Sequence, residues 1–133
     1  MANMSTRLQS VFLVRSEHLN HQGHLFGGDL MAEIDTVAYC LLRQAFGEQA
    51  FVTRAAEISF EQPARLGDAI TFAAALASIG RTSVRVEVIG RVRGQRICGA
   101  HMVYVNVGTD GKKAPVPRRQ AKPCPRGRTA ARR

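Results

Sequence analysis

The chain has 133 residues, 45% of them hydrophobic, and a formal net charge of +9. This length suits one domain, and no apolar run approaches the roughly 20 residues that cross a bilayer. The first residues lack the apolar core of a secretory signal, so we expect a cytoplasmic protein without membrane contacts. Three widely spaced cysteines favour neither a disulfide framework nor a four-cysteine zinc site, and we expect Cys40 and Cys98 to be small core residues.

The positive charge is concentrated at the C-terminal end of the chain. Nine of the 19 lysines and arginines lie in residues 112–133, which contain no acid, and the remaining ten balance the 10 acids. The same segment has four of the five prolines and few bulky apolar residues. Such a composition cannot bury enough surface to offset the entropy of ordering. We therefore expect a folded domain over residues 1–111, a flexible basic tail over 112–133, and no specific nucleic-acid site.

The first two elements expected along the chain are a short strand and a long helix. Residues 7–14 are β-prone, and a polar loop follows. From Gly28 to about Phe46, apolar residues recur every three or four positions, and Gly47 ends the pattern. The apolar stripe consists of Leu30, Ile34, Val37, Ala38, Leu41, Leu42 and Ala45.

Four strands joined by short turns are expected after the helix. The apolar pattern changes to a period of two, which predicts strands over 50–60, 69–79, 81–93 and 96–107, with a hairpin turn at 94–95. Short turns make antiparallel neighbours, and a helix with one apolar stripe needs a sheet to cover it. We expect an α+β fold, an antiparallel sheet wrapped around one long central helix. One helix cannot shield such a sheet completely, so we also expect self-association.

Two glycines at the helix start form the first candidate site. Gly27 and Gly28 lack Cβ atoms, so a ligand can approach their backbone N–H groups, which have no partner within the helix. The helix dipole favours negative charge there, which suits a polarised carbonyl or an oxyanion. The alternative is a tight entry from loop to helix, because glycine is a common turn residue.

Asp35 interrupts the apolar part of the helix. Aspartate has poor helix propensity and is costly when buried without a partner, so a carboxylate here is a candidate general base. The alternatives are a solvated helix face or a salt bridge with Arg43 or Arg54. Asp35 lies about 10 Å along the axis from Gly28, too far for one copy to place both groups on one reacting carbon. Two copies with antiparallel helices could bring them together.

Asn20 and three histidines precede the helix. Asn20 offers a donor and an acceptor that can hold a water or a carbonyl, although a loop asparagine is usually only a turn former. His18, His21 and His24 recur every third residue, but this spacing without a nearby cysteine gives weak support to a zinc site, and we expect no metal. No nucleophile-elbow, phosphate-loop or dinucleotide motif is present.

Several spaced motifs together resemble one known family. The stretch NHQGHLFGGDLMAEID, residues 20–35, resembles the signature of the hot-dog-fold acyl-CoA thioesterases, especially the YciA-type and brain-type acyl-CoA hydrolases. The family pattern Asn-x-x-Gly-x-x-Phe-Gly-Gly, followed by an aspartate seven residues later, falls on Asn20, Gly23, Phe26, Gly27, Gly28 and Asp35. Further matches are Phe60, Pro63, Gly67 and Asp68, and the hairpin Gly80, Arg81, Thr82 and Ser83. The likeness covers most of residues 7–107.

This resemblance implies a hot-dog fold and hydrolysis of acyl-CoA to a free acid and CoA, with no cofactor. Asp35 would act as general base or nucleophile, Asn20 would position water or the carbonyl, and the Gly28 N–H would polarise the thioester. Gly23, Phe26 and Gly27 would contact the substrate. The resemblance also implies a site between subunits and a homo-oligomer, often a hexamer built as a trimer of dimers.

Three further residues and two rival functions complete the expectations. Arg81, Thr82 and Ser83 are candidates for binding the nucleotide or pantetheine part of CoA, with a solvated hairpin tip as the alternative.

One rival function is that of a hot-dog dehydratase acting on hydroxyacyl thioesters. Such an enzyme would require a histidine paired with the acid, and His101 is the candidate away from the loop. The other is a non-enzymatic CoA- or nucleic-acid-binding module dominated by the basic tail.

Overall fold

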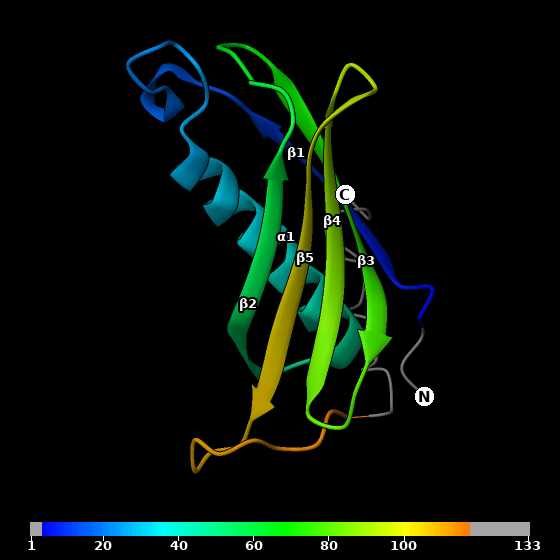
Figure 1. Ribbon diagram of the computed structural model, residues 1–133. Coiled ribbons are helices and arrows are strands. Elements are labelled where there is room, and N and C mark those ends of the chain that lie inside the picture. Colours follow the sequence, from blue (N-terminus) through cyan, green and yellow to red (C-terminus); the bar gives the residue numbers. More distant parts are fainter. Residues whose placement is uncertain (1–3, 118–133) are drawn as a thin grey trace, which may run out of the picture.

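The computed structural model describes residues 4–117, and its elements follow the expected order (Figure 1). They are β1 Arg7–Leu13, a short 3-10 helix Ser16–His18, α1 Gly27–Phe46, β2 Ala50–Phe60, β3 Ala69–Ile79, β4 Ser83–Val92 and β5 Gln95–Val107. Two strands have the predicted bounds, and the helix begins one residue earlier than predicted. Among the described residues, no helix is long and apolar enough to span a membrane.

The turn between β4 and β5 lies one residue earlier than predicted. Val92 pairs with Gln95, so the turn consists of Arg93 and Gly94. Both have positive φ angles, 50° and 79°, as the central residues of a type I′ hairpin turn require. The predicted turn at 94–95 was wrong because the glycine occupies the second turn position, not the first.

All five strands form one antiparallel sheet in the order β1-β3-β4-β5-β2. The sheet curves along α1, which lies against one of its faces (Figure 1). The helix carries the chain from β1 at one edge to β2 at the other, and the three later strands fill the space between them. β2 therefore has a free edge within one protomer.

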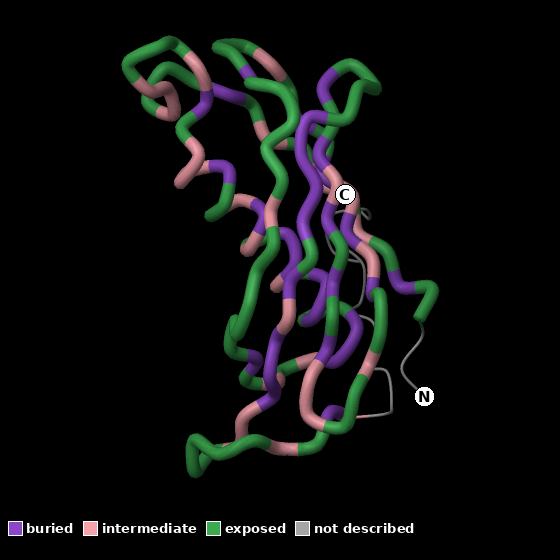
Figure 2. Tube along the Cα trace, viewed as in Figure 1, coloured by how far each residue is buried: buried purple, intermediate pink, exposed green. Residues whose placement is uncertain are grey.

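The core lies between α1 and the inner face of the sheet. The whole predicted helix stripe is buried, together with Phe46. Along β4, buried residues alternate with more exposed ones, as Figure 2 shows. The inward-facing residues of β3 and β4 include Ile70, Phe72, Ala74, Leu76, Val84, Val86, Val88 and Val92, all 6% exposed or less.

The two cysteines in the described part of the chain differ in burial. Cys98 is buried on β5, as expected, but Cys40 is exposed on α1. The expectation for Cys40 was wrong because position 40 lies outside the helical stripe that contacts the sheet, beside exposed Arg43 and Gln44.

Residues 112–117, assigned from composition to the tail, contact the end of the sheet. Val116 is only 3% exposed, and its N–H donates to the carbonyl of Arg81 at 2.8 Å. The buried side chain of Asn106 donates through Nδ2 to the carbonyl of Pro115 at 3.0 Å. The folded unit thus continues to Pro117, and the tail prediction now concerns residues 118–133, which lie outside the described residues.

Leu41→Ala tests the packing of α1 on the sheet. Leu41 is 0% exposed, and we expect the free energy of unfolding to fall by about 2–5 kcal/mol because the lost side chain leaves a cavity. The control is Gln44→Ala on the exposed face of the same helix, with an expected change within about 0.5 kcal/mol. Chemical denaturation measures both, and equal losses would contradict this core assignment.

Candidate active site

Asp35 lies where α1 passes β2 and β5. Its Oδ1 accepts a hydrogen bond from the hydroxyl of Tyr104 at 2.7 Å and another from the hydroxyl of Thr53 at 3.1 Å. Asp35 is half-buried, Thr53 is exposed and Tyr104 is fully buried. Arg43 pairs instead with Glu48 at 3.5 Å, and no cation within residues 4–117 forms an ion pair with Asp35. The carboxylate therefore has two neutral hydroxyl partners and no counter-ion in that range.

The hydroxyl of Tyr104 can act only as a donor to Asp35. Burial, followed by the hydrogen bond and the charge of Asp35, raises the pKa of Tyr104, so the phenol keeps its proton at neutral pH. The ring of Tyr39, one helical turn beyond Asp35, packs edge-on against the Tyr104 ring, with centroids 6.3 Å apart. A tyrosine-lined part of the core thus borders the carboxylate.

Sequence reasoning missed Thr53 and Tyr104. They are direct partners in the β2–β5 register, and both point to the face that carries α1. The sequence held one signal for these partners of Asp35. Each side chain lies on the inward face of its predicted strand, the face that packs against the helix. The strand order that brings β2 beside β5 was not predicted, so this signal could not be used.

Asn20 organises the loop that leads into α1. Its Oδ1 accepts hydrogen bonds from the backbone N–H groups of Gln22, at 2.9 Å, and His24, at 3.1 Å. Gly23 has a φ of 78° and donates its N–H to the Asn20 carbonyl at 3.0 Å. The turn-forming role weighed for Asn20 is therefore present. Its Nδ2 has no acceptor among residues 4–117 and remains available to a ligand.

The glycine pair adjoins an exposed aromatic ring. Phe26 is the N-cap residue of α1, and the residue is 54% exposed. A Cβ atom on Gly28 would lie 2.6 Å from Cε2 of Phe26, so only glycine allows this ring to rest over the helix start. The first helical hydrogen bond runs from Leu30 N–H to the Phe26 carbonyl at 3.1 Å, which leaves the Gly28 N–H without an acceptor in the described range.

A cleft of about 250 Å³ lies beside the loop, between the start of α1 and the segment after β2. Asn20 and His24 line it together with Leu30, Phe60 and Pro63. Asp35 is not among its lining residues. One protomer therefore brings Asn20 close to the helix start but not close to Asp35.

The predicted CoA-binding residues lie at the other end of the molecule. Arg81 and Thr82 lie in the turn between β3 and β4, and Ser83 is the first residue of β4. This hairpin is at the bottom of Figure 1, whereas the loop before α1 is at the top. The carbonyl of Thr82 accepts the Asn106 N–H at 2.8 Å, so the hairpin is tied to the end of β5. Within one protomer this hairpin does not contribute to the cleft at the loop.

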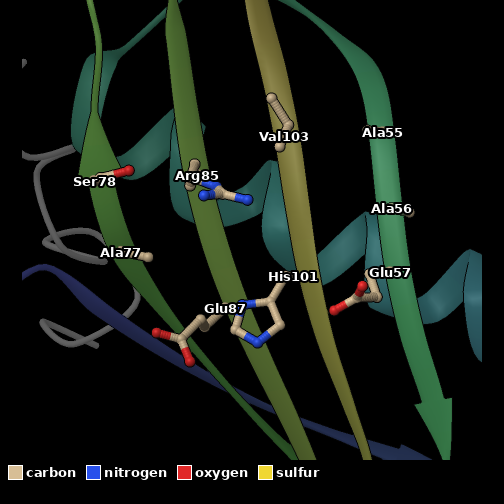
Figure 3. Close-up of a pocket in the computed structure, with 9 residues that line it drawn as sticks. All are labelled: Ala55, Ala56, Glu57, Ala77, Ser78, Arg85, Glu87, His101 and Val103. Atoms are coloured by element: carbon tan, nitrogen blue, oxygen red, sulfur yellow. The ribbon is translucent and has the colours of Figure 1, made fainter.

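A second cleft, of about 590 Å³, lies on the outer face of the sheet, away from α1. Figure 3 shows His101 there between Glu57 and Glu87, its direct partners on β2 and β4. This histidine faces away from the side of the sheet that carries Asp35, so the pair expected of a dehydratase does not form within a protomer. Among residues 4–117, no group of three or more His, Cys, Asp and Glu side chains could hold a metal ion.

Comparison with known proteins identifies the family. A family model described as the thioesterase superfamily matches residues 22–98, more than half of the chain. This chain belongs to the thioesterase superfamily. The matched range includes Asp35, Thr53 and the glycine pair, and it ends before Tyr104.

Individual relatives of this chain also have thioesterase names. The acetyl-coenzyme A thioesterase of Mus musculus is 30% identical over an alignment of 126 positions, and the alignment covers 88% of this chain but only 23% of that protein. The chain thus spans about a quarter of the length of this relative. The acyl-CoA thioester hydrolase YciA of Salmonella typhimurium is 29% identical over an alignment of 107 positions, and the alignment covers 74% of this chain and 80% of that one.

Solved thioesterase structures confirm the hot-dog fold. The acyl-CoA hydrolase of Staphylococcus aureus, solved with butyryl coenzyme A, coenzyme A and coenzyme A disulfide, is 25% identical with a TM-score of 0.75. The match covers 85% of this chain and 70% of that one. Alanine variants of that hydrolase at an aspartate, an asparagine and a threonine match with a TM-score of 0.77 at 23% identity.

Two substitutions separate the turn-forming role of Asn20 from its free amide. Asn20→Ala removes the acceptor of two backbone N–H groups, and we expect the free energy of unfolding to fall by about 1–2 kcal/mol. Asn20→Asp keeps an oxygen at that position, so we expect a loss of about 0.5 kcal/mol or less. Thermal or chemical denaturation measures both. Equal stability of the two variants would mean that the loop does not depend on Oδ1.

Proposed function

We propose that this protein hydrolyses acyl-CoA thioesters to a free carboxylic acid and CoA, with Asp35 as general base. The observation that carries the proposal is the half-buried Asp35 carboxylate, which accepts hydrogen bonds from two hydroxyl groups and has no counter-ion within residues 4–117. A carboxylate that is not neutralised by a salt bridge can accept a proton from water. Membership of the thioesterase superfamily supports the substrate class.

The residue types around the site support the same reaction. The S. aureus hydrolase was studied with alanine at an aspartate, an asparagine and a threonine. This chain has Asp35, Asn20 and Thr53 among its candidate site residues. We propose that these three residues act together on the thioester.

The chemistry requires one water, one base and one oxyanion partner. Oδ2 of Asp35 takes a proton from the water while the water oxygen bonds to the thioester carbon. The carbonyl oxygen becomes an oxyanion that accepts the Gly28 N–H, at the positive end of the helix dipole. The carbon–sulfur bond then breaks, and the CoA thiolate leaves and takes a proton from the Asp35 carboxylic acid. Asn20 Nδ2 holds the water or the carbonyl, and Gly23, Phe26 and Gly27 line the acyl or thioester part.

We further propose that two protomers share each site. Asp35 and Gly28 are about 10 Å apart along one helix, and the Asn20 cleft does not include Asp35. The edge strand β2 and the helix carry large exposed apolar residues whose burial would favour association. These residues are Phe26, Met31, Val52 and Phe60, all at least 45% exposed. Antiparallel pairing of two β2 edges would set two helices side by side in opposite directions, and a hexamer would be a trimer of such dimers.

The proposal for CoA binding concerns the hairpin Arg81, Thr82 and Ser83. Arg81 is exposed, and the other two residues are half-buried. Their distance from the loop within one protomer favours a CoA molecule that reaches the hairpin of another protomer. An exposed arginine suits the phosphates of the nucleotide end.

Asp35→Asn is the direct test of the proposed reaction. Asparagine keeps an oxygen for the two hydroxyl donors but cannot accept a proton, so we expect kcat to fall by about 10²–10⁴-fold. A chromogenic thiol reagent measures CoA release from an acyl-CoA panel. Glu87→Gln, on the outer face of the sheet, is the control and should keep wild-type turnover.

Other outcomes of this assay would favour a rival function. Hydration or dehydration of a hydroxyacyl thioester without thiol release would indicate a dehydratase. Binding of CoA without turnover by the wild-type protein would indicate a binding module. Wild-type kcat in Asp35→Asn would reject Asp35 as the base.

Mixing Asp35→Asn with Asn20→Asp tests the shared site. We expect Asn20→Asp to be inactive as well, because an aspartate has no amide donor to hold the water or the carbonyl. If Asp35 of one protomer serves the loop of its partner, a dimer of one Asp35→Asn chain and one Asn20→Asp chain contains one intact site and one doubly altered site. Random exchange of subunits should then restore about a quarter of the wild-type activity, because half of the dimers are mixed. A mixture that stays as inactive as its components would show that each site belongs to one chain. Sedimentation or light scattering gives the oligomeric state.

A further inference from the structure

Tyr104 is a buried residue that carries a hydroxyl group at the edge of the core, next to Asp35. The residue is 0% exposed and belongs to the same core cluster as Ile34, Val84 and Met102. A hydroxyl in an apolar core is costly unless it finds a partner, and phenylalanine would fill the same space without that requirement. The hydroxyl of Tyr104 donates to one acceptor, Oδ1 of Asp35, at 2.7 Å. Folding alone therefore does not account for this polar group.

We infer that Tyr104 is a positioning residue for the proposed hydrolysis. Its hydroxyl holds Oδ1 of Asp35, so that Oδ2 is the oxygen that receives the proton of the attacking water. This inference rests on the function proposed above and adds to it a residue from outside the matched family range. Tyr104 acts through Asp35 and does not itself touch the substrate.

Two donors on one oxygen determine the orientation of the carboxylate. A carboxylate otherwise rotates freely about its last bond, because that torsion has a broad energy profile. Here Tyr104 and Thr53 both donate to Oδ1, from strands that pair directly with each other. Oδ2 accepts no hydrogen bond from the residues that the structure describes. One oxygen is thus fixed to the sheet and the other is left for water.

The backbone beside Thr53 supports this arrangement. The β2–β5 register shifts between Thr53 and Ala55, with Arg54 as the extra residue. A β-bulge re-aims the neighbouring side chain and is common next to active sites. The bulge follows the residue whose hydroxyl reaches Asp35. The exposed hydroxyl of Thr53 and the hydroxyl of buried Tyr104 thus donate to the same oxygen of Asp35.

The buried phenol also remains neutral through the reaction. The raised pKa of Tyr104, caused first by burial and then by Asp35, keeps its proton in place. When Oδ2 accepts the water proton, Oδ1 keeps both hydrogen bonds, and no proton passes to or from Tyr104. The phenol stabilises the charged form of the carboxylate and fixes its orientation.

Tyr104→Phe is the first test, with Tyr39→Phe as the matched control. Loss of the hydroxyl should lower kcat about tenfold, while KM stays within about twofold because the substrate contacts are unchanged. The acid limb of the pH profile of kcat/KM should move to higher pH, since the carboxylate loses a donor that stabilises its charge. Tyr39→Phe removes the hydroxyl of the adjacent ring and should keep the wild-type values.

A second measurement uses the two tyrosines of the chain. In the Tyr39→Phe background, incorporation of 3-fluorotyrosine labels Tyr104 alone. Its more acidic hydroxyl is a stronger donor, so the acid limb should move to lower pH, opposite to the shift in Tyr104→Phe. A protein in which Tyr104 only fills space would show neither shift. This variant keeps the ring and the hydroxyl, so the test remains available if Tyr104→Phe does not fold.

The outcomes separate this inference from the proposed function. If Asp35→Asn retains hydrolysis, the proposed function fails, whatever Tyr104→Phe does. If Asp35→Asn is inactive but Tyr104→Phe and the fluorinated protein keep the wild-type kcat and pH profile, only the role of Tyr104 is overturned. Support for the inference requires the two opposite pH shifts. The double variant Tyr104→Phe and Asp35→Asn should then be no slower than Asp35→Asn, because both act through one carboxylate.

Discussion

The packing of one helix against one curved sheet is the constraint on which the rest of this structure depends. The apolar stripe of α1 is almost completely removed from water, and the strands before and after it are placed at opposite edges of the sheet. Because the helix is rigid, the same packing sets the separation of its N-terminal glycines from Asp35. Both groups of the proposed site are thus carried by the element that also organises the core, and neither can move without disturbing it.

Much of the fold could be predicted from the chain because its patterns are regular. The period of the apolar residues changes once, after Gly47, from that of a helix to that of strands, and the bounds of β2 and β3 agree with the prediction. The errors occurred where a local feature competed with the pattern. In the β4–β5 turn, Arg93 adopts a positive φ angle that is unusual for its residue type. In residues 112–117, a proline-rich composition hid Val116, a single apolar residue with a buried position.

The candidate site could be predicted only in part. Asn20, Gly28 and Asp35 could be identified because the residue type at each position calls for a structural or functional explanation. The spacing of the motif also relates them to a family. Thr53 and Tyr104 do not stand out, because threonine and tyrosine are ordinary strand residues. Their role as partners of Asp35 depends on the pairing of β2 with β5, a contact between segments about fifty residues apart in the chain. Such long-range pairing leaves no local trace, so the partners of Asp35 emerge only from the three-dimensional arrangement.

The anchoring of residues 112–117 has a consequence for any shortened form of this protein. A chain that stops at position 111 would lose the side chain of Val116 and the acceptor that Pro115 offers to Asn106, so its hydrophobic interior would be left open at one end. Inactivity of such a fragment would report damage to the globule and would say nothing about the arginines and lysines beyond it. Only a boundary placed after Pro117 separates the contribution of those cations from the integrity of the body that precedes them.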